Sequence, residues 1–407
     1  MAKKIFLTVL MCLTFSSLGF ASSLVRADPI QKLITDEIQK YNIPGIVVSI
    51  KYPNQPIKTY FAGFSDLEKH TSMSSNTLFP IGSITKSFIG VLALKLQEEH
   101  QLKLTDTLNK LAMPGDTLSK LIKQHPFLKN ITLYQLLTHT SGLPDFLNSR
   151  LYNEKFEKYP TRHWTDEELL NSALKLPMLQ QNKNNKYSYS NTDYVLAGIA
   201  MESVTKKSLK ILLDNLFQQA HLKNIYYPLS ATSPIPEYIK IHLAHGYIDE
   251  QTNWPKMIVY RSYPSIMIPG VKPLKGYDIT QLALIINQQF PASGAIISNT
   301  QTMAQWFSEL FNSRIISKSS AQTAVTGVKT PFNFKYGLGI SIRFSSYFNS
   351  MLYSHNGSQL GYQTNLIYLK NQNIVIAITI NSDSDKISDP EKWIAKDIIS
   401  NLLQKKK

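Results

Sequence analysis

The strongest constraint on the fold is that strand-like segments stand at both ends of the chain. Two segments near the start, 45–53 and 58–66, are rich in β-branched and aromatic residues and are separated by a Pro/Asn turn, which predicts a hairpin. Three more strands are predicted near the end, over 351–356, 361–369 and 373–381. If consecutive strands pair in one antiparallel sheet, the two ends of the chain must meet in that sheet.

Helical patterns dominate the middle of the chain. They are found in five segments, 83–99, 132–139, 165–175, 192–219 and 300–313, and a last helix with a proline at its start is expected over 389–403. The sequence therefore predicts an α/β (α+β) chain, in which helices flank an antiparallel sheet built from both termini and a mostly helical lobe packs on that sheet. A crevice between the two lobes is where a functional site is expected.

We interpret residues 28–407 as one domain of two lobes. The sheet lobe is expected from about 28–80 and 292–407, and the helical/loop lobe from about 81–291. Within the second lobe, 228–292 contains many prolines and scattered aromatic residues, which indicates an elaborated loop region rather than a separate domain.

Residues 1–27 have the layout of a secretory signal peptide, because a basic pair is followed by an apolar stretch and then by small residues. Cleavage is expected after Ala27, with Ala21 as the competing position. Cys12, the only cysteine, lies in this segment, so the mature chain would have no disulfide and no cysteine-based metal site. Export without disulfides is typical of the bacterial envelope, so we expect a periplasmic or extracellular protein with no transmembrane segment after signal removal.

The chain is basic, with a net charge of +15 that falls by three, to +12, if Lys3, Lys4 and Arg26 leave with the signal. This charge favours peripheral contact with anionic lipid head groups or acidic cell-wall polymers, although a soluble basic protein without such partners has the same composition. No basic run is interleaved with aromatic residues, so no nucleic-acid groove is expected. His242 and His245 form the only close histidine pair and lack a nearby third ligand, so no metal site is expected.

A Ser-x-x-Lys pattern occurs twice, and its surroundings distinguish the two copies. Ser83 and Lys86 begin an apolar segment that predicts a buried helix, on which both side chains face the same side. A buried lysine loses its preference for the charged form and can take a proton from the serine, while the helix N-terminus offers N–H groups to a developing oxyanion. Ser203 and Lys206 have the same spacing but lie among further lysines, so a solvated, protonated lysine is expected there.

Tyr189 and Asn191 follow a polar loop and precede a helical pattern. A tyrosine at the mouth of a loop can relay a proton if nearby cations lower its pKa. In an extended segment Asn191 would point the same way as Tyr189 and would offer its amide to a substrate carbonyl. A packed tyrosine followed by a helix-capping asparagine would have the same sequence, so this pattern alone is weakly specific.

His355, Asn356 and Gly357 lie in a predicted strand. Glycine there removes a side chain and lets another backbone approach, as an extended substrate would. A lone histidine in such a strand is more often structural than functional. Because imidazole titrates near neutrality, a functional His355 predicts activity that changes between about pH 5.5 and 8.

In this order, the three elements resemble the serine β-lactamase and penicillin-binding-protein family, in particular its class C β-lactamases, D-alanyl-D-alanine carboxypeptidases and related esterases. Family members carry Ser-x-x-Lys, then Tyr-x-Asn, then Lys/His-x-Gly. Six blocks carry the resemblance over most of the chain from about 30 to 380: "LFPIGSITKSF", "LLTHTSGLPD", "YSNTDYVLAG", "ASGAIISNTQTMAQWF", "YGLGI" and "HNGSQLGY". The resemblance implies a β-lactamase/transpeptidase-like fold.

The resemblance also implies roles for the first two elements. Ser83 would be the acylated nucleophile, in a reaction that needs no metal or organic cofactor. Lys86 would be its base partner or would help to hold Tyr189 as phenolate. Tyr189 would carry the proton to the leaving group and later activate water.

The remaining site residues would bind the substrate or support the reaction. Asn191 would hydrogen-bond the substrate amide, and His355 would be catalytic in the place where β-lactamases often have lysine. Asn356 and Gly357 would border the substrate. The backbone N–H of Ser358 would form the oxyanion hole together with that of the nucleophile.

These implications predict a serine hydrolase that acts on D-alanyl-D-alanine-type peptides, including those of peptidoglycan, or on β-lactams. A histidine in place of the lysine resembles carboxypeptidase and esterase members more than efficient class C β-lactamases. Two alternatives stay open. One is an esterase with the same nucleophile, for which aromatic residues within 226–264 would suit an apolar acyl group. The other is a non-catalytic cell-envelope-binding protein on the same fold. Such a protein has no need of all four of the polar residues Ser83, Lys86, Tyr189 and Asn191.

Overall fold

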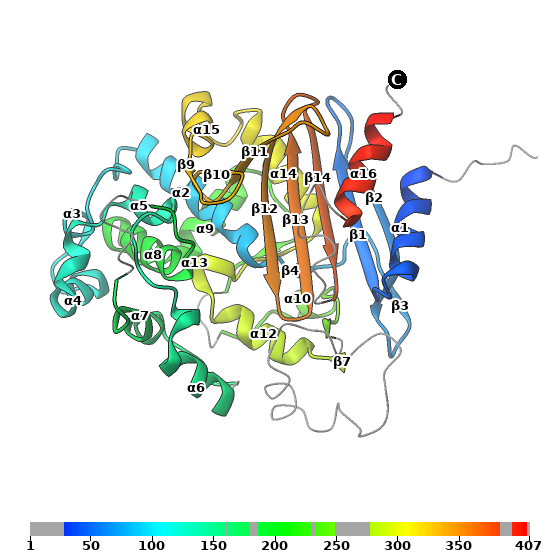
Figure 1. Ribbon diagram of the computed structural model, residues 1–407. Helices are drawn as coiled ribbons and strands as arrows, with labels where there is room; N and C mark the ends of the chain where they lie inside the picture. Colours follow the sequence, from blue (N-terminus) through cyan, green and yellow to red (C-terminus); the bar gives the residue numbers. More distant parts are fainter. Residues whose placement is uncertain are drawn as a thin grey trace, which may run out of the picture.

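The computed structural model describes residues 28–159, 161–178, 186–228, 233–248, 277–382 and 393–404, so the predicted signal peptide lies outside the described residues. At its centre is a nine-stranded antiparallel sheet in the order β3-β2-β1-β14-β13-β12-β11-β10-β9 (Figure 1). Strands from the beginning and the end of the chain meet where β1 pairs with β14. The predicted antiparallel sheet from both terminal regions is therefore confirmed.

The longer strands form the middle of the sheet, and two-residue strands lie at both of its edges. Its members are β1 (Gly45–Lys51), β2 (Lys58–Asp66), β3 (Thr71–Ser72), β9 (Val328–Lys329), β10 (Lys335–Tyr336), β11 (Ser341–Ser345), β12 (Ser350–Gln359), β13 (Tyr362–Leu369) and β14 (Ile374–Ile380). Two small sheets join distant loops: one contains β4 (Phe79–Pro80), β8 (Ile297–Ser298) and β5 (Ile225–Tyr226), the other β6 (Tyr247–Ile248) and β7 (Tyr277–Asp278).

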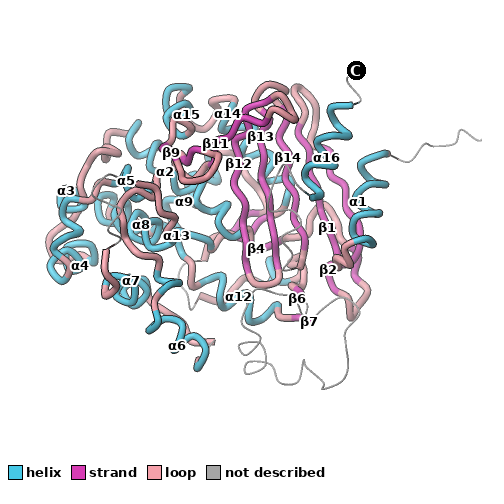
Figure 2. Tube along the Cα trace, in the orientation of Figure 1, coloured by secondary structure: helices cyan, strands magenta, loops and turns pink. Residues whose placement is uncertain are grey.

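Helices cover both faces of the sheet and build a lobe at one side of it (Figure 2). The α-helices are α1 (Pro29–Lys40), α2 (Thr85–Glu98), α3 (Leu108–Leu111), α4 (Thr117–Gln124), α5 (Leu133–Leu137), α6 (Arg150–Lys158), α7 (Asp166–Leu174), α8 (Asn191–Thr205), α9 (Leu209–Gln219), α10 (Glu237–Lys240), α12 (Thr280–Gln288), α13 (Pro291–Gly294), α14 (Thr300–Phe311), α15 (Lys318–Ala324) and α16 (Trp393–Gln404). Three short 3₁₀ helices are η1 (Gly82–Ile84), η2 (Pro126–Asn130) and η3 (Phe146–Asn148).

The sequence of β14, IVIAITI, shows why both faces of the sheet are covered. Successive side chains of a strand point to opposite faces, and all seven residues of this strand are buried. The isoleucines at every second position join the hydrophobic core under α1 and α16, which lie side by side in Figure 1. Val375 and Ala377 point the other way, into the larger core that contains α2 and α14.

The structure divides one predicted helix. The pattern over 192–219 forms two helices, α8 and α9, because Lys206 ends α8 in the left-handed conformation with φ of 55°. Ser208 then caps α9, its hydroxyl oxygen accepting from the backbone N–H of Ile211. The other predicted helices correspond to α2, α5, α7, α14 and α16, although the proline expected at the start of the last one lies outside the described residues.

The predicted loop region 228–292 is described only in part, over 233–248 and 277–292. These parts hold α10, β6, β7, α12 and the start of α13. Their contacts tie them to the body of the protein, since Leu78 and His242 are linked by a backbone hydrogen bond of 2.8 Å. The boundaries expected for the two lobes stay a prediction.

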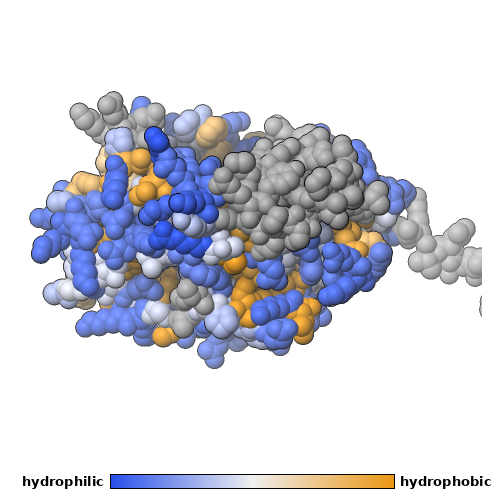
Figure 3. All heavy atoms as spheres, turned by 90° about the horizontal axis from the view of Figure 1, so that it is seen from below, coloured by the Kyte–Doolittle hydropathy of each residue, from blue (hydrophilic) through white to orange (hydrophobic). Residues whose placement is uncertain are grey.

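The surface on the underside of the molecule is mostly hydrophilic. Where its described residues are visible, hydrophobic residues form small separate areas (Figure 3). Across the described ranges, no helix has both the length and the apolar character that a bilayer crossing requires.

Candidate active site

Ser83 lies in η1, directly before the buried helix α2. The turn is held on both sides. Before it, the N–H of Ile81 donates to the carbonyl of Ile296 at 3.0 Å and β4 pairs with β8. After it, the hydroxyl oxygen of Thr85 accepts from the backbone N–H of Ile296 at 3.2 Å. Residues Thr85 to Leu94 of α2 are all buried, as the apolar pattern predicted. A serine at this point is therefore fixed in space, with a buried helix beginning behind it.

Lys86, in the first turn of α2, is completely buried and points at Ser83. Its Nζ lies 2.9 Å from Ser83 Oγ and 2.8 Å from two acceptors, Asn191 Oδ1 and the carbonyl oxygen of Ser293. Burial lowers the pKa of Lys86 to about 7, against the opposing charges of Asp145 and Asp193. The lysine can therefore exchange a proton at neutral pH.

Tyr189 contacts the same oxygen from the other side, because its hydroxyl donates to Ser83 Oγ at 2.9 Å. The residue is 36% exposed, so it lies at the entrance of the site. The phenol is nevertheless desolvated where it packs against His139 and Ser83, and this desolvation, the largest influence, raises the pKa of Tyr189 above its ordinary value. The phenol is therefore neutral, and Lys86 lies over its ring, 4.9 Å from the centroid, rather than at its hydroxyl. The phenolate role that the resemblance allowed for Lys86 is not favoured.

Asn191 reaches the site for a different reason from the one expected. It is the first residue of α8 rather than part of an extended segment, and Ser190 occupies the N-cap position. Its amide is oriented by Asp145, whose Oδ2 accepts from the side-chain Nδ2 at 2.9 Å and from the backbone N–H at 3.1 Å. With Oδ1 bound to Lys86, one amide N–H remains for a substrate.

Behind Tyr189, the buried side chains of His139, Asp193 and Ser141 hold residues 188–190 in place. The backbone N–H of Ser188 donates to the carbonyl oxygen of His139 at 2.8 Å. The backbone N–H of Ser190 donates to Nδ1 of the same histidine at 3.3 Å. Asp193 Oδ2 lies 3.0 Å from the same Nδ1, and Ser141 donates to the other oxygen of this carboxyl. Burial lowers the pKa of His139 and raises that of Asp193.

The segment of β12 around Gly357 forms the opposite wall. β11 begins at Ser341, opposite Ser354, so the edge of β12 after Ser354 is not covered by β11 and faces η1. A Cβ on Gly357 would come within 2.0 Å of the Ile81 carbonyl oxygen, and one on Gly82 would come within 2.7 Å of the Ser358 carbonyl oxygen. The backbone that packs against Gly357 is thus that of Ile81 in the same protein, and not that of an extended substrate.

The side chains of Asn356 and Ser358 are exposed, on the strand face opposite to His355. Ser358 Oγ accepts from Gln363 Nε2 at 2.9 Å. The contribution of Ser358 to a site is therefore its backbone, which lies against Gly82.

The expectation that His355 titrates near neutrality is wrong. The residue is 3% exposed, and its Nδ1 lies 2.6 Å from the carbonyl oxygen of Asn356. This contact places the proton on Nδ1, so Nε2 accepts from the hydroxyl of Tyr336 at 2.9 Å. Burial and then the charge of Lys86 lower the pKa of His355 to about 3. The imidazole is therefore neutral at all physiological pH values.

The second Ser-x-x-Lys pattern builds no such site. Ser203 donates to the carbonyl oxygen of Leu111 at 2.8 Å and to Asp116, so its hydroxyl holds α8 against the α3–α4 region. Lys206 is exposed and ends the helix. As predicted, the surroundings separate the two copies of the pattern.

The two close histidines also have separate partners. His245 Nδ1 lies 2.6 Å from Asp278 Oδ2, and His242 Nδ1 lies 2.8 Å from the carbonyl oxygen of Tyr238. Within the part of the chain that the structure describes, no three histidine, cysteine or acidic side chains are grouped in a way that could hold a metal ion.

Several supporting residues were not identified individually from the sequence. Asp145, Asp193, Ser293 and Tyr336 each lie within one of the six blocks that carry the family resemblance. The blocks were the available signal, but they do not show which member contacts Lys86 or His355. Ser293 in particular acts through its main-chain carbonyl, which any residue would supply.

Comparison with known proteins gives distant relatives. Protein flp of Staphylococcus aureus (strain N315) is 29% identical over 186 residues, which are 46% of this chain and 35% of that protein. Penicillin-binding protein 4* of Bacillus subtilis (strain 168) is 23% identical over 327 residues, 79% of this chain and 65% of that protein. The chain thus spans about a third of the length of flp and somewhat under two thirds of the second relative.

A similar solved structure is D-amino acid amidase from Ochrobactrum anthropi SV3 complexed with D-phenylalanine. Its TM-score is 0.73 at 20% sequence identity, with 93% of this chain and 98% of that chain covered. This similarity shows that the two share the fold. A family model described as Beta-lactamase matches residues 30–399, nearly the whole chain, and the protein therefore belongs to the Beta-lactamase family.

Proposed function

We propose that the protein is a serine hydrolase that forms an acyl-enzyme on Ser83. The observation that carries this proposal is that Ser83 Oγ lies 2.9 Å from both Lys86 Nζ and the Tyr189 hydroxyl. A nucleophile between a buried amine and a phenol has a base on one side and a proton donor on the other.

Lys86 is the base. A neutral amine has two N–H bonds and one lone pair, and the acceptors Asn191 Oδ1 and Ser293 O take the two N–H bonds. The lone pair is then left for the Ser83 hydroxyl proton. As Ser83 Oγ bonds to the substrate carbonyl carbon, its O–H bond breaks and the proton passes to Lys86. A pKa of about 7 keeps much of the amine neutral at physiological pH.

We assign the oxyanion site to the backbone N–H groups of Ser83 and Ser358. The first belongs to the turn that leads into α2, and the second lies in the part of β12 that is packed against Gly82. The negative charge of a tetrahedral intermediate would develop between them, where fixed N–H dipoles stabilise it without reorganisation.

Tyr189 is the proton donor to the leaving group. Its phenol proton passes to the leaving nitrogen as the C–N bond breaks, which leaves a transient phenolate beside the Ser83 ester. Water then attacks the ester and gives one proton to this phenolate. As the ester bond breaks, the proton held by Lys86 passes back to Ser83 Oγ, which releases a carboxylic acid and restores the serine hydroxyl. The neutral phenol suits this step, because an amine leaves only when its nitrogen is protonated.

As substrates we propose D-alanyl-D-alanine-type peptides, such as those of peptidoglycan, and β-lactams. Membership of the family supports this choice, as do the names of two similar proteins, a penicillin-binding protein and a D-amino acid amidase. The remaining N–H of Asn191 would bind the amide carbonyl of such a substrate. In an esterase with the same nucleophile, the rate would depend less on the Tyr189 hydroxyl, because an alcohol that leaves easily requires little protonation.

We also propose that the protein is exported to the periplasm or the cell exterior after loss of residues 1–27, and that its basic surface contacts the anionic envelope. The layout of the first residues supports export. Sequencing the N-terminus of protein recovered outside the cytoplasm tests it, and an intact Met1 would contradict it.

The test of the central proposal is the intact mass of the mature protein after mixing with benzylpenicillin, beside the Ser83→Ala variant. A stable adduct that the variant lacks would indicate a penicillin-binding peptidase with slow deacylation. Rapid consumption of the drug without adduct would indicate a β-lactamase. If neither occurs, D-alanyl peptides, D-amino acid amides and p-nitrophenyl esters are tested, and no turnover of any would overturn the proposal in favour of a non-catalytic protein.

A further inference from the structure

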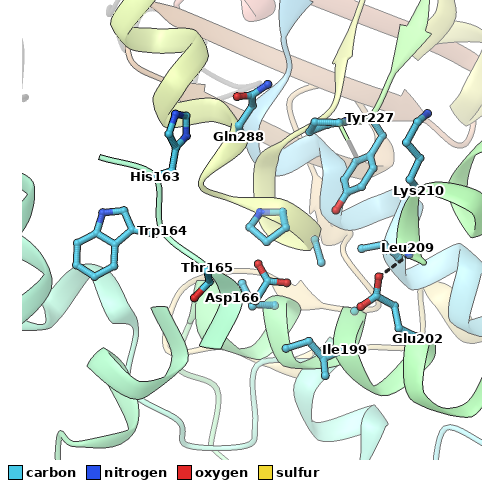
Figure 4. Close-up of a pocket in the computed structure, with 15 residues that line it drawn as sticks. His163, Trp164, Thr165, Asp166, Ile199, Glu202, Leu209, Lys210, Tyr227 and Gln288 are labelled. Atoms are coloured by element: carbon cyan, nitrogen blue, oxygen red, sulfur yellow. Dashed lines mark hydrogen bonds between the residues drawn. The ribbon is translucent and has the colours of Figure 1, made fainter. Parts of the chain in front are cut away.

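A second cavity of about 290 Å³ lies in the helical lobe, and α7, α8, α9 and α13 contribute its walls (Figure 4). Its volume is close to roughly 300 Å³, at which pockets for small ligands begin. Ser83, Lys86 and Tyr189 do not line it. Its wall includes Ala292, which directly precedes Ser293, so the cavity lies behind α13 as seen from Lys86.

Two carboxyl groups from different helices line this cavity. Asp166 begins α7, and its carboxylate accepts no hydrogen bond from the described residues. Glu202 on α8 accepts one, from the backbone N–H of Leu209 at 2.6 Å. Burial and the charge of Glu202 raise the pKa of Asp166 to about 6, so the two groups repel each other when both are charged.

The lysine that lines the cavity does not neutralise this pair. Lys210 lines the cavity, but its Nζ bonds to Asp214, 2.7 Å and 3.0 Å from the two carboxylate oxygens. Figure 4 shows the end of the Lys210 side chain pointing away from both acids. Within the described chain, neither Asp166 nor Glu202 has an ion-pair partner, although the protein as a whole carries a charge of +15.

The hydroxyl of a buried tyrosine points into the same cavity. Tyr227 is 4% exposed, and its hydroxyl has no hydrogen-bond partner among the residues that the structure describes. Figure 4 shows this hydroxyl directed toward the space beside Asp166. The hydroxyl of a buried tyrosine usually has a hydrogen-bond partner, so this oxygen, which opens to the cavity, points to a ligand that supplies the missing partner.

We propose that this cavity binds a primary alkylammonium ion. An ammonium group has three N–H donors, and Asp166, Glu202 and Tyr227 provide oxygen acceptors for them from three sides. Ile199 and Leu209 form an apolar wall that suits a methylene chain. A metal ion fits less well, because the described residues offer no third anionic or imidazole ligand here.

The test is isothermal titration calorimetry of the mature protein with n-hexylammonium chloride, beside n-hexanol, which has the same chain without the charge. The ammonium is expected to bind with one site per chain and at least about tenfold more tightly than the alcohol. Asp166→Asn and Glu202→Gln should each weaken binding about tenfold or more, and Tyr227→Phe by a smaller factor.

The matched control is Glu167→Gln. Glu167 is the next residue of α7, is exposed and does not line the cavity, so this variant removes the same charge from the surface. Its affinity should stay within about twofold of the unmodified protein. Equal weakening by the control, binding of the alcohol as tight as that of the ammonium, or no binding at all would overturn the proposal. Tyr227→Phe keeps the ring, so it tests the site even if an acid variant fails to fold. Ser83→Ala should bind normally, which separates this proposal from that of the hydrolase.

Discussion

The carbonyl oxygen of Ser293 accepts a hydrogen bond from Lys86 Nζ at 2.8 Å, although the two residues are 207 positions apart. This contact joins α13 to the first turn of α2 and takes up one N–H of the lysine. Asn191 Oδ1 takes up a second. The orientation of the lone pair of Lys86 toward Ser83 thus depends on two distant segments, which makes the geometry around the amine the most testable feature of the site.

The first prediction concerns pH. Burial lowers the pKa of Lys86 to about 7, so the amine is protonated below that pH and is a base above it. The rate of Ser83 acylation should therefore rise as pH increases through about 7 and level off above about 8. Single-turnover acylation between pH 5.5 and 9 measures this. His355 contributes nothing here because its pKa is about 3, so His355→Gln should keep the midpoint. A profile that falls with pH would contradict the base role.

The second prediction compares the two Ser-x-x-Lys patterns. Lys86→Met fills the same buried space without a base and should lower the acylation rate by about 10³-fold, within the usual range for general-base catalysis. Lys206→Met is the matched control, since this lysine is exposed at the end of α8, and it should change the rate less than about twofold. Similar losses in both variants would contradict the argument that the surroundings, and not the spacing, make Lys86 the base.

The third prediction separates a proton donor from a packing residue at position 189. Tyr189→Phe keeps the ring but removes the hydroxyl that contacts Ser83. Turnover of a D-alanyl peptide should fall by about 10² or more, whereas a p-nitrophenyl ester, which needs no protonation, should lose less than about tenfold. Steady-state kinetics on both substrates measure the ratio. Equal losses would assign Tyr189 to positioning of Ser83.

The central fold could be predicted because its strands carry strong local signals. β14 is uninterrupted by polar residues except Thr379, and its pairing with β1 follows from the need to bury both strands. The helix α1 was missed although its signals are present: Asp28 caps it, a proline begins it, and Ile30 and Ile34 form part of an apolar stripe. The strands β9 and β10 have two residues each, and no periodicity exists over so short a length.

The site could be predicted only as far as side-chain types reveal it. Ser83, Lys86 and Tyr189 come together as their order in the chain implied. The burial of His355 could not be foreseen, because it depends on Tyr336, which belongs to a different strand and is itself 1% exposed. A sequence shows that a histidine is present, but its pKa follows from the surrounding packing.

The fourth prediction concerns the wall formed by β12. Gly357→Ala would place a methyl group 2.0 Å from the carbonyl oxygen of Ile81, so strand and turn must separate. Acylation should fall by at least about tenfold, with a loss of stability of about 1–3 kcal/mol. Ser358→Ala is the neighbouring control, because its side chain is exposed and only its backbone is assigned a role. Its acylation rate should stay within about threefold, and a large loss would show that the hydroxyl takes part.

The fifth prediction tests whether Asp145 acts on Lys86 or only on Asn191. Its carboxylate orients the Asn191 amide, and its charge also raises the pKa of Lys86 against the stronger effect of burial. Asp145→Asn removes that charge, so the midpoint of the acylation–pH profile should move to lower pH even if the maximal rate also falls. A purely structural role would lower the rate at every pH and leave the midpoint in place. Asp214→Asn removes an equal charge next to Lys210 on the surface, and its midpoint should equal that of the unmodified protein.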